Sequence, residues 1–327
     1  MIRLGHPLAF AGFLDHVGTS VEGYFRRQKL PTLCKDPNAY VPLRKAWGLF
    51  YDAARREDQY FGWHVGRFVG DHLMNAAVLK QLDSAPTLYM GLQRLVRLIS
   101  AEASHLQIGI LERRFGVLFY THYPGMSDEP GYTESQTYQL ELYIDLIRHF
   151  AGANWSPTEI GIEAPNAPAF LGDRFAASRI KINQPFGYLA IPRLDLSRKL
   201  LTIHREADDK APLVTPRQLD YADTLSLLLK PYLLNGYPNM HFAAELMDTS
   251  TRTLMRRLNA CGTGYQNLID DTRFQKSRDL LLNTDRSIIG IAYSVGFIDQ
   301  ANFTRWFRRI AGTTPSEFRR AMLPALD

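Results

Sequence analysis

The sequence predicts two domains: an N-terminal α+β domain, with helices first and short strands after them, and a C-terminal all-α domain. The chain has 327 residues, about twice the usual length of one domain. The segment HREADDKAPLVTP (204–216) is polar, charged and rich in proline, as linkers are. Charge also changes there, because residues 250–320 carry 11 Arg and 1 Lys against 6 acidic residues, whereas residues 1–249 sum to about zero. The predicted domains are therefore 1–203 and 217–327, with a linker at 204–216.

The first domain begins with helical patterns. Apolar spacing predicts helices over 10–30, 43–57, 60–80 and 86–101. Two runs rich in β-branched and aromatic residues follow, LQIGIL (106–111) and GVLFYTHY (116–123). The polar segment ERRFG between them predicts a hairpin turn.

A helix is then predicted at 133–152, followed by three short strands at 159–164, 179–184 and 187–192. Every segment after the linker has helical spacing. The predicted spans are 217–233, 240–247, 250–259, 264–282, 287–295, 299–310 and 315–322.

One pattern occurs twice in the second domain, in FAAELMDTSTRTLMRRL (242–258) and in IGIAYSVGFIDQANFTRWF (289–307). Each copy has a short helix containing alanine, then a tight turn, then a second helix with apolar residues four apart. Ser250 and Asp299 are suitable N-caps for the second helices. This is the helix-turn-helix unit, whose second helix can enter the major groove of DNA.

The second helix of each copy separates apolar from polar side chains. In the later copy, Phe303, Trp306, Phe307 and Ile310 form one stripe at helical spacing, which we expect to be buried. Amide and guanidinium groups lie off that stripe and can read base edges. The predicted DNA contacts are Thr251, Arg252, Met255 and Arg256 in the first unit and Gln300, Ala301, Asn302, Thr304, Arg305 and Arg308 in the second.

The helix predicted at 264–282 joins the two units. Its 19 residues span roughly 28 Å, and two helices that read one side of DNA are about 34 Å apart. Such a helix can hold both units in adjacent major-groove segments. Arg273 and Lys276 on it are predicted to neutralise phosphates, although acidic residues interleave with them.

The segment RSIIGIAYSVGFIDQANFTRWFRRIAGTTPSEFR (286–319) resembles the second-unit signature of the AraC/XylS family of bacterial transcriptional regulators. The shared pattern is I-x-x-[IV]-A-x-x-x-G-F, then F-x-R-x-F, then G-x-[ST]-P-x-x-[FY]-R. The resemblance implies seven helices with two helix-turn-helix units that read consecutive major grooves near a promoter. It implies base contacts from Arg252, Met255, Arg256, Gln300, Ala301 and Arg305. Ala301 departs from the longer polar residue often found there, which leaves its methyl group to meet a thymine methyl.

The first 200 residues resemble the regulatory domain of AraC-family members related to the ornithine-utilisation regulator. Matching runs are LPTLCKDPNAYVPLRKAWGLF, TESQTYQLELYIDLIRHFAG with WSPTEIGIEAPNAP, and FGYLAIPRLDLSRKLL. The resemblance implies a sensor domain that binds a small-molecule effector and forms a homodimer. It does not identify the effector, and its family label of arabinose binding is not carried over.

Candidate effector-binding residues gather near strand ends. Tyr120 and His122 end one strand, and Lys181, Asn183 and Tyr188 lie on or near two others. Aromatic rings with a few convergent polar groups are typical of small-molecule sites, but core aromatics and strand-edge polar residues give the same pattern. No His-x-x-x-His or Cys-x-x-Cys spacing, phosphate loop or nucleophile motif occurs, so neither a metal site, a cofactor nor catalysis is expected.

Together these features predict a sequence-specific DNA-binding transcriptional regulator, controlled by a small molecule and not an enzyme. Promoter DNA and RNA polymerase are the expected partners. The N-terminus carries charges and no sustained apolar core, and no apolar run is long enough to span a membrane, so a cytoplasmic protein is expected. Two alternatives stay open: an enzyme or metabolite-binding module fused to a DNA-binding domain, and an architectural DNA binder without a ligand.

Overall fold

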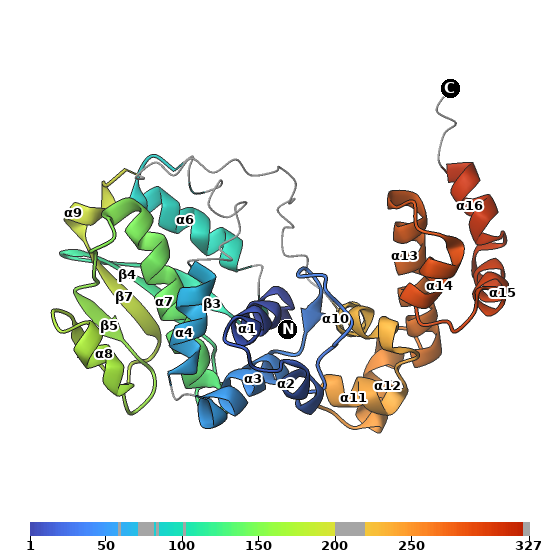
Figure 1. The fold of residues 1–327 in the computed structure, drawn as a ribbon, viewed down its shortest axis with the longest axis horizontal. Coiled ribbons are helices and arrows are strands. Elements are labelled where there is room, and N and C mark those ends of the chain that lie inside the picture. The colour runs from blue at the N-terminus through green and yellow to red at the C-terminus, as the bar shows by residue number, and fades with distance from the viewer. Residues whose placement is uncertain (58–59, 71–81, 83–84, 101–102, 200–219, 323–327) are drawn as a thin grey trace.

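The N-terminal and C-terminal elements form two bodies that meet near the helix Glu22–Arg27 (Figure 1). The structure is a computed structural model that describes residues 1–322 except 58–59, 71–81, 83–84, 101–102 and 200–219. The predicted linker, 204–216, lies outside the described residues, and so do residues 71–80 of the helix predicted at 60–80. The domain limits at 203 and 217 therefore stay predictions.

The N-terminal body contains helices first and strands after them, as predicted. Its helices are α1 (Gly5–His16), α2 (Glu22–Arg27), α3 (Leu43–Arg56), α4 (Phe61–Phe68), α6 (Leu88–Ile99), α7 (Tyr132–Ala151), α8 (Ala169–Arg174) and α9 (Arg193–Leu196). Its strands are β1 (Ile2–Arg3), β2 (Tyr40–Val41), β3 (Gln107–Arg113), β4 (Gly116–His122), β5 (Glu159–Gly161), β6 (Arg179–Lys181) and β7 (Gly187–Pro192).

Five strands form one mixed sheet in the order β3-β4-β7-β5-β6, and β5 and β6 are the parallel pair. The predicted hairpin is confirmed, because β3 and β4 pair antiparallel with Ile110 opposite Phe119. One face of the sheet packs against α6 and α7 through Phe119, Leu189 and other apolar side chains. This core is distinct from a second one that α1, α3 and α4 build on the other side of α7.

Helix α7 is central because it contributes to both cores. Tyr138 packs with the first helices, whereas Ile144 packs with the sheet. Helix α4 crosses α7 so closely that a Cβ on Gly62 would lie 2.1 Å from the carbonyl oxygen of Glu134. Any larger residue at position 62 would force the helices apart.

Helix α7 also buries a carboxylate that has hydrogen-bond partners for only one of its two oxygens. Glu141 is fully buried, one of its oxygens has no hydrogen-bond partner, and the other lies 3.4 Å from Arg174. Burial raises the pKa of Glu141 to about 7. Since the folded state holds this proton more tightly than the unfolded chain, the group stabilises the fold at low pH, and that contribution is lost as the pH rises from about 4.5 to about 7.

We therefore expect Glu141→Gln to raise the free energy of unfolding by about 1–3 kcal/mol at pH 8 and to change it little at pH 5. Denaturant unfolding at both pH values measures the difference. Asp173→Asn, which neutralises an exposed carboxylate on α8, is the matched control and should show no such pH dependence. An equal effect of Glu141→Gln at both pH values would contradict the expected ionisation.

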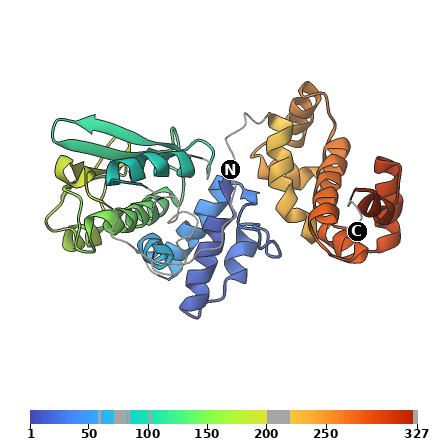
Figure 2. The ribbon, with the colours of Figure 1, turned by 90° about the horizontal axis from the view of Figure 1, so that it is seen from above.

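The C-terminal body is all helical, as predicted. Its helices are α10 (Tyr221–Leu229), the 3-10 turn η2 (Lys230–Asn235), α11 (Met240–Leu246), α12 (Thr251–Ala260), α13 (Tyr265–Asn283), α14 (Ile288–Ser294), α15 (Gln300–Ala311) and α16 (Pro315–Met322). One apolar cluster joins α10, α11 and α12 with the start of α13, and another joins α14, α15 and α16 with its end. Figures 1 and 2 show α15 and α16 at the end of the molecule away from the N-terminal body.

Ion pairs connect the two bodies at α11. Lys29 and Lys45 each approach Glu245, at 2.8 and 3.2 Å, and Arg44 pairs with Asp248 in the turn after α11. These side chains are partly exposed, so each pair contributes little stability on its own. Together they place the start of α3 beside the first helix-turn-helix unit.

Some element predictions were wrong at their ends. The helix predicted over 10–30 is two helices, α1 and α2, because Gly18 adopts a positive φ of 77° and ends the first. The strands β1 and β2 have two residues each and show no periodicity that a sequence pattern could reveal. Within the part of the chain described here, no helix has both the length and the apolar character needed to cross a membrane.

Candidate DNA interface

The first helix-turn-helix unit is α11, the turn at 247–250, and α12. Ser250 caps α12 as predicted, since its hydroxyl accepts a hydrogen bond from the Thr253 amide at 3.2 Å. Asp248 adopts a positive φ of 50° in the turn, a conformation that aspartate tolerates better than most residues. Leu254 and Leu258 are fully buried against α11 and α10, so the opposite face of α12 faces outward.

The predicted contact residues of this unit lie on that outer face. Arg252, Met255 and Arg256 are exposed, and Thr251 is half-buried at the first turn of α12. The helix therefore presents two guanidinium groups and one flexible apolar side chain to the surface.

The second unit is α14, the turn at 295–299, and α15. Gly296 adopts a positive φ of 83°, and a Cβ at this position would meet the carbonyl oxygens of Leu233 and Gly236 at 2.6 and 2.8 Å. Only glycine fits both demands. Asp299 caps α15 as predicted, because its carboxylate accepts a hydrogen bond from the Asn302 amide at 2.7 Å.

On α15 the predicted division into faces holds with one exception. Phe303, Trp306 and Phe307 are buried, whereas Ile310 is 38% exposed, so its assignment to the buried stripe was wrong. Ile310 is the second-last residue of α15 and follows the last of its three buried aromatic residues. The polar candidates Gln300, Ala301, Asn302, Arg305 and Arg308 are exposed, and Thr304 is half-buried.

An aspartate that the sequence analysis did not single out holds α15 in place. The carboxylate of Asp270, on α13, accepts a hydrogen bond from the Trp306 indole at 2.8 Å and pairs with Arg309 at 3.1 Å. A buried indole N–H needs a hydrogen-bond acceptor, so Trp306 itself was the one sign in the sequence that such an acceptor lies nearby. Asp270 therefore orients the exposed face of α15.

Arg273 was predicted to neutralise phosphates on the helix surface, but the structure buries this residue, which is only 6% exposed. The guanidinium lies between two aromatic rings, 4.8 Å from the centre of Tyr237 and 4.7 Å from that of Phe297. It also donates a hydrogen bond to the Gly296 carbonyl at 3.4 Å. Arg273 thus connects the segment before the first unit to the turn of the second.

Lys276, the other residue predicted to neutralise phosphates, is half-buried. Its ammonium group donates a hydrogen bond to the Lys230 carbonyl at 3.2 Å, and burial lowers its pKa. One side of α13 is covered by η2 and α10. Apolar spacing alone could not tell which basic residues lie on the covered side.

The predicted effector residues lie in or beside the main sheet, where several of them contact one another or neighbouring residues. Tyr120 lies opposite Tyr188 in the β4–β7 pairing. Glu159 pairs with Lys181 at 2.9 Å and accepts a hydrogen bond from the Tyr188 hydroxyl at 2.7 Å. Asn183 occupies a bend with a positive φ of 53°. These contacts lie within and beside the sheet, and effector binding by these residues stays a prediction.

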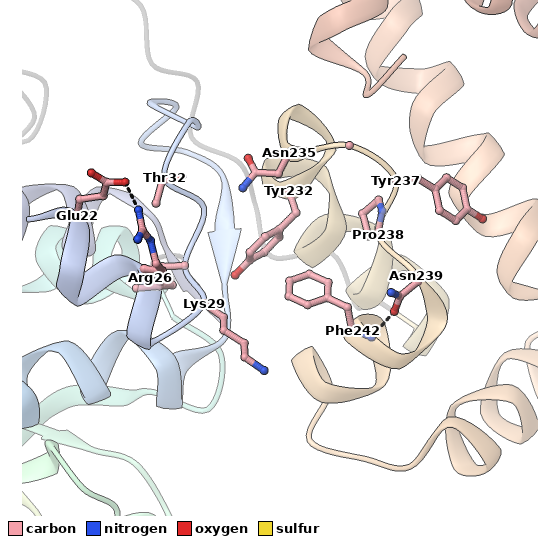
Figure 3. Close-up of a pocket in the computed structure, with 12 residues that line it drawn as sticks. Glu22, Arg26, Lys29, Thr32, Tyr232, Asn235, Tyr237, Pro238, Asn239 and Phe242 are labelled. Atoms are coloured by element: carbon pink, nitrogen blue, oxygen red, sulfur yellow. Dashed lines mark hydrogen bonds and ion pairs between the residues drawn. The ribbon is translucent and has the colours of Figure 1, made fainter. Parts of the chain in front are cut away.

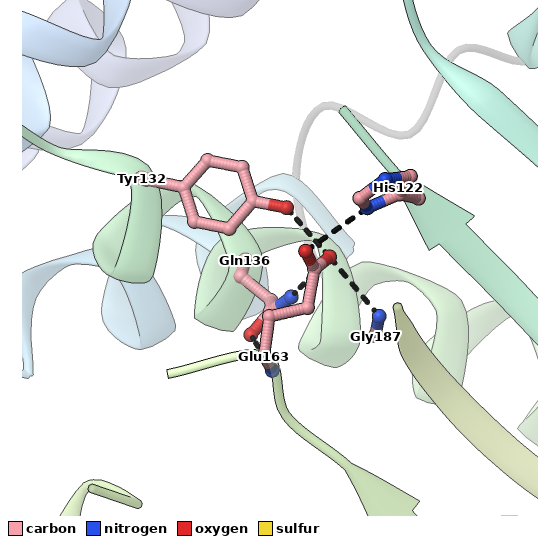
Figure 4. A network of polar contacts seen from close by, with 5 residues as sticks. All are labelled: His122, Tyr132, Gln136, Glu163 and Gly187. Carbon is pink, nitrogen blue, oxygen red and sulfur yellow. Dashed lines mark hydrogen bonds and ion pairs between the residues drawn. The ribbon is translucent and has the colours of Figure 1, made fainter. Parts of the chain in front are cut away.

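His122 belongs to a different group, centred on Glu163 (Figure 4). The Glu163 side chain is 4% exposed and lies 3.0 Å from the His122 ring nitrogen. It also accepts hydrogen bonds from Tyr132 at 2.6 Å, Gln136 at 3.3 Å and the Gly187 amide at 3.2 Å. Four donors around one buried carboxylate join β4, α7 and β7, and the sequence analysis did not find this acid.

Two units of this kind joined by one helix define the class of tandem helix-turn-helix proteins. A family described as a helix-turn-helix domain matches residues 243–321, which run from α11 to α16. The chain is 32% identical over 150 residues to the ornithine utilization regulator of Pseudomonas aeruginosa, covering 43% of each protein. It is 30% identical over 171 residues to the transcriptional activator RhaS of Salmonella schwarzengrund, covering 45% of this chain and 59% of that one. The chain therefore carries a helix-turn-helix domain, as the sequence predicted, and it is similar in part to a regulator and to an activator.

These matches are partial, since the chain spans about half the length of the curated relatives it matches. Among solved structures, the regulator CdpR of Pseudomonas aeruginosa covers 91% of this chain at 15% identity, with a TM-score of 0.39. The DNA-binding domain of AdpA, solved with a target DNA, covers 31% at 26% identity and a TM-score of 0.28.

Proposed function

We propose that this protein is a sequence-specific transcriptional regulator that inserts α12 and α15 into DNA major grooves. The observation that carries the proposal is shared by both helices: apolar side chains anchor them in the core while arginine side chains stand exposed, and α15 adds the exposed Gln300 and Asn302. Arginine can pair with guanine and glutamine with adenine. The relatives described above, a regulator and an activator, support the same function.

The proposal also covers the binding partners of the protein and its cellular compartment. Promoter DNA is the primary partner, RNA polymerase is the expected second one, and a regulator of this kind works in the cytoplasm. The N-terminal body serves as the sensor and the dimerisation domain. The relatives favour regulation over catalysis, and we propose no enzymatic activity for the chain.

Loss of a reading arginine should weaken specific binding. We expect Arg256→Ala and Arg305→Ala each to cost about 1–3 kcal/mol of affinity for the target site, or roughly fivefold to 150-fold in Kd. Fluorescence anisotropy with the chain's own upstream DNA measures this at fixed salt concentration. Arg55→Ala removes the same charge from α3 in the N-terminal body and is the matched control, so its Kd should match that of the wild type.

The same measurement separates the proposal from its rival. An architectural binder would show equal affinity for the upstream DNA and for a scrambled duplex, and the arginine variants would weaken both equally. A wild-type Kd that does not distinguish the two duplexes would therefore contradict sequence-specific regulation. Unchanged binding in both variants would reject α12 and α15 as the reading helices.

A further inference from the structure

A cleft of about 490 Å³ lies between the two bodies (Figure 3), within the size range of small-molecule sites. One wall comes from α2 and the segment after it, and the other comes from η2, the loop 235–239 and α11. The residues that argue for a ligand are Arg26 and Lys29 on the first wall and Tyr232, Asn239 and Phe242 on the second. Neither wall belongs to the sheet in which the sequence analysis placed the effector.

Tyr232 has a buried hydroxyl group without a partner. The residue is 4% exposed, and its hydroxyl makes no hydrogen bond within the part of the chain that the structure describes. Figure 3 shows the hydroxyl directed across the gap toward the wall that carries Arg26 and Lys29. Burial raises the pKa of Tyr232 far above the physiological range, so the group stays an O–H donor. A buried donor left unsatisfied destabilises the protein, and an acceptor that enters the cleft would remove that cost.

The other polar groups of the cleft are also mainly donors. Arg26 and Lys29 bring two positive charges; Glu22, a carboxylate that also lines the cleft, pairs with Arg26, and Glu245 pairs with Lys29. The Asn239 side-chain oxygen is used to cap α11, which leaves its amide N–H groups. Apolar surface lies beside these donors, since the Phe242 and Tyr232 rings pack 5.0 Å apart. Donors beside an aromatic wall suit an acceptor-rich group attached to a small carbon skeleton.

We propose that this cleft binds a small organic carboxylate whose oxygen accepts the hydrogen bond of the Tyr232 hydroxyl. The proposal deepens the proposed function and rests on it, because it assigns the effector a place and a chemical class. The carboxylate would lie near Arg26 and Lys29, and its carbon skeleton would lie against Phe242.

The position of the cleft connects it to both DNA-binding units. Asn239, in its wall, caps α11 of the first unit. Tyr237, in the same loop, lies 4.8 Å from the Arg273 guanidinium, which also lies 4.7 Å from the Phe297 ring in the turn of the second unit. A ligand that orders the loop 235–239 therefore acts on the supports of α12 and α15 together.

The test is a thermal-shift titration of the full chain with benzoate, succinate and L-glutamate at millimolar concentrations and matched ionic strength. Benzamide, succinamide and L-glutamine are the uncharged counterparts. We expect at least one acid, and not its amide, to raise the Tm of the wild type. Tyr232→Phe should leave the protein folded, with an unchanged or higher Tm without ligand, and should weaken the response to that acid roughly tenfold.

Tyr221→Phe is the matched control, since the Tyr221 hydroxyl is also buried without a partner but lies outside the cleft lining. It should keep the full response. The assignment is overturned if none of the acids raises the wild-type Tm, or if Tyr232→Phe responds as the wild type does. Both readouts are independent of DNA, so a protein that fails to bind its upstream DNA contradicts the proposed function and leaves the result for the cleft interpretable.

Discussion

Phe307→Ala should lower the free energy of unfolding of the C-terminal body by about 3–5 kcal/mol, the usual cost of removing a buried phenylalanine ring. Phe307 is fully buried, and its ring lies 5.5 Å from Phe274, 5.7 Å from Phe303 and 5.5 Å from Phe318. These neighbours come from three helices, so the cavity cannot close by the movement of one of them. Urea unfolding followed by circular dichroism measures the loss.

Ile310→Ala is the control for this change, on the same helix and one turn away. Because Ile310 is 38% exposed, its truncation should cost less than about 1 kcal/mol. The contrast tests the corrected face of α15 directly. Comparable losses from the two variants would mean that Ile310 is part of the core after all.

Glu163→Ala should have the second large effect, a loss of about 3–5 kcal/mol in the stability of the N-terminal body. The change removes the acceptor for Tyr132, Gln136, His122 and the Gly187 amide at once. Each donor left buried without a partner costs more than the hydrogen bond contributed. Thermal unfolding of the full chain, read at the transition of the N-terminal body, measures the effect.

His122→Ala separates the carboxylate from its most exposed partner. The His122 side chain is 24% exposed, and the other three donors keep their acceptor, so the cost should be about 1 kcal/mol. A loss as large as that of Glu163→Ala would show that the histidine, and not the acid, is the centre of the network.

Much of the fold was predictable because it follows from repeating apolar patterns. The predicted helix at 133–152 is α7 at 132–151, and the β3–β4 hairpin follows from the turn ERRFG. The two helix-turn-helix units were predictable for the same reason and because Ser250 and Asp299 are recognisable caps. Periodicity shows which side of a helix is apolar, and that side was correct for Phe303 and Phe307.

What failed depended on contacts between segments distant in sequence. Arg273 looked like any basic residue on a linker helix, and only its stacking between Tyr237 and Phe297 shows that it is buried. Glu163 gained its role from four residues that lie 24 to 41 positions away. The cleft beside Tyr232 exists only because two bodies meet there, and no local pattern records that meeting.

The stacked position of Arg273 has a consequence for the operator. One guanidinium contacts both the segment before the first unit, through Tyr237, and the turn of the second, through Phe297, and we expect this contact to restrain the tilt of one unit relative to the other. On a double helix, that stiffness would fix the number of base pairs between the two half-sites. An insertion of about five base pairs, half a turn of B-DNA, would place one half-site on the opposite side of the duplex. The two helix-turn-helix units could then not bind both half-sites at once.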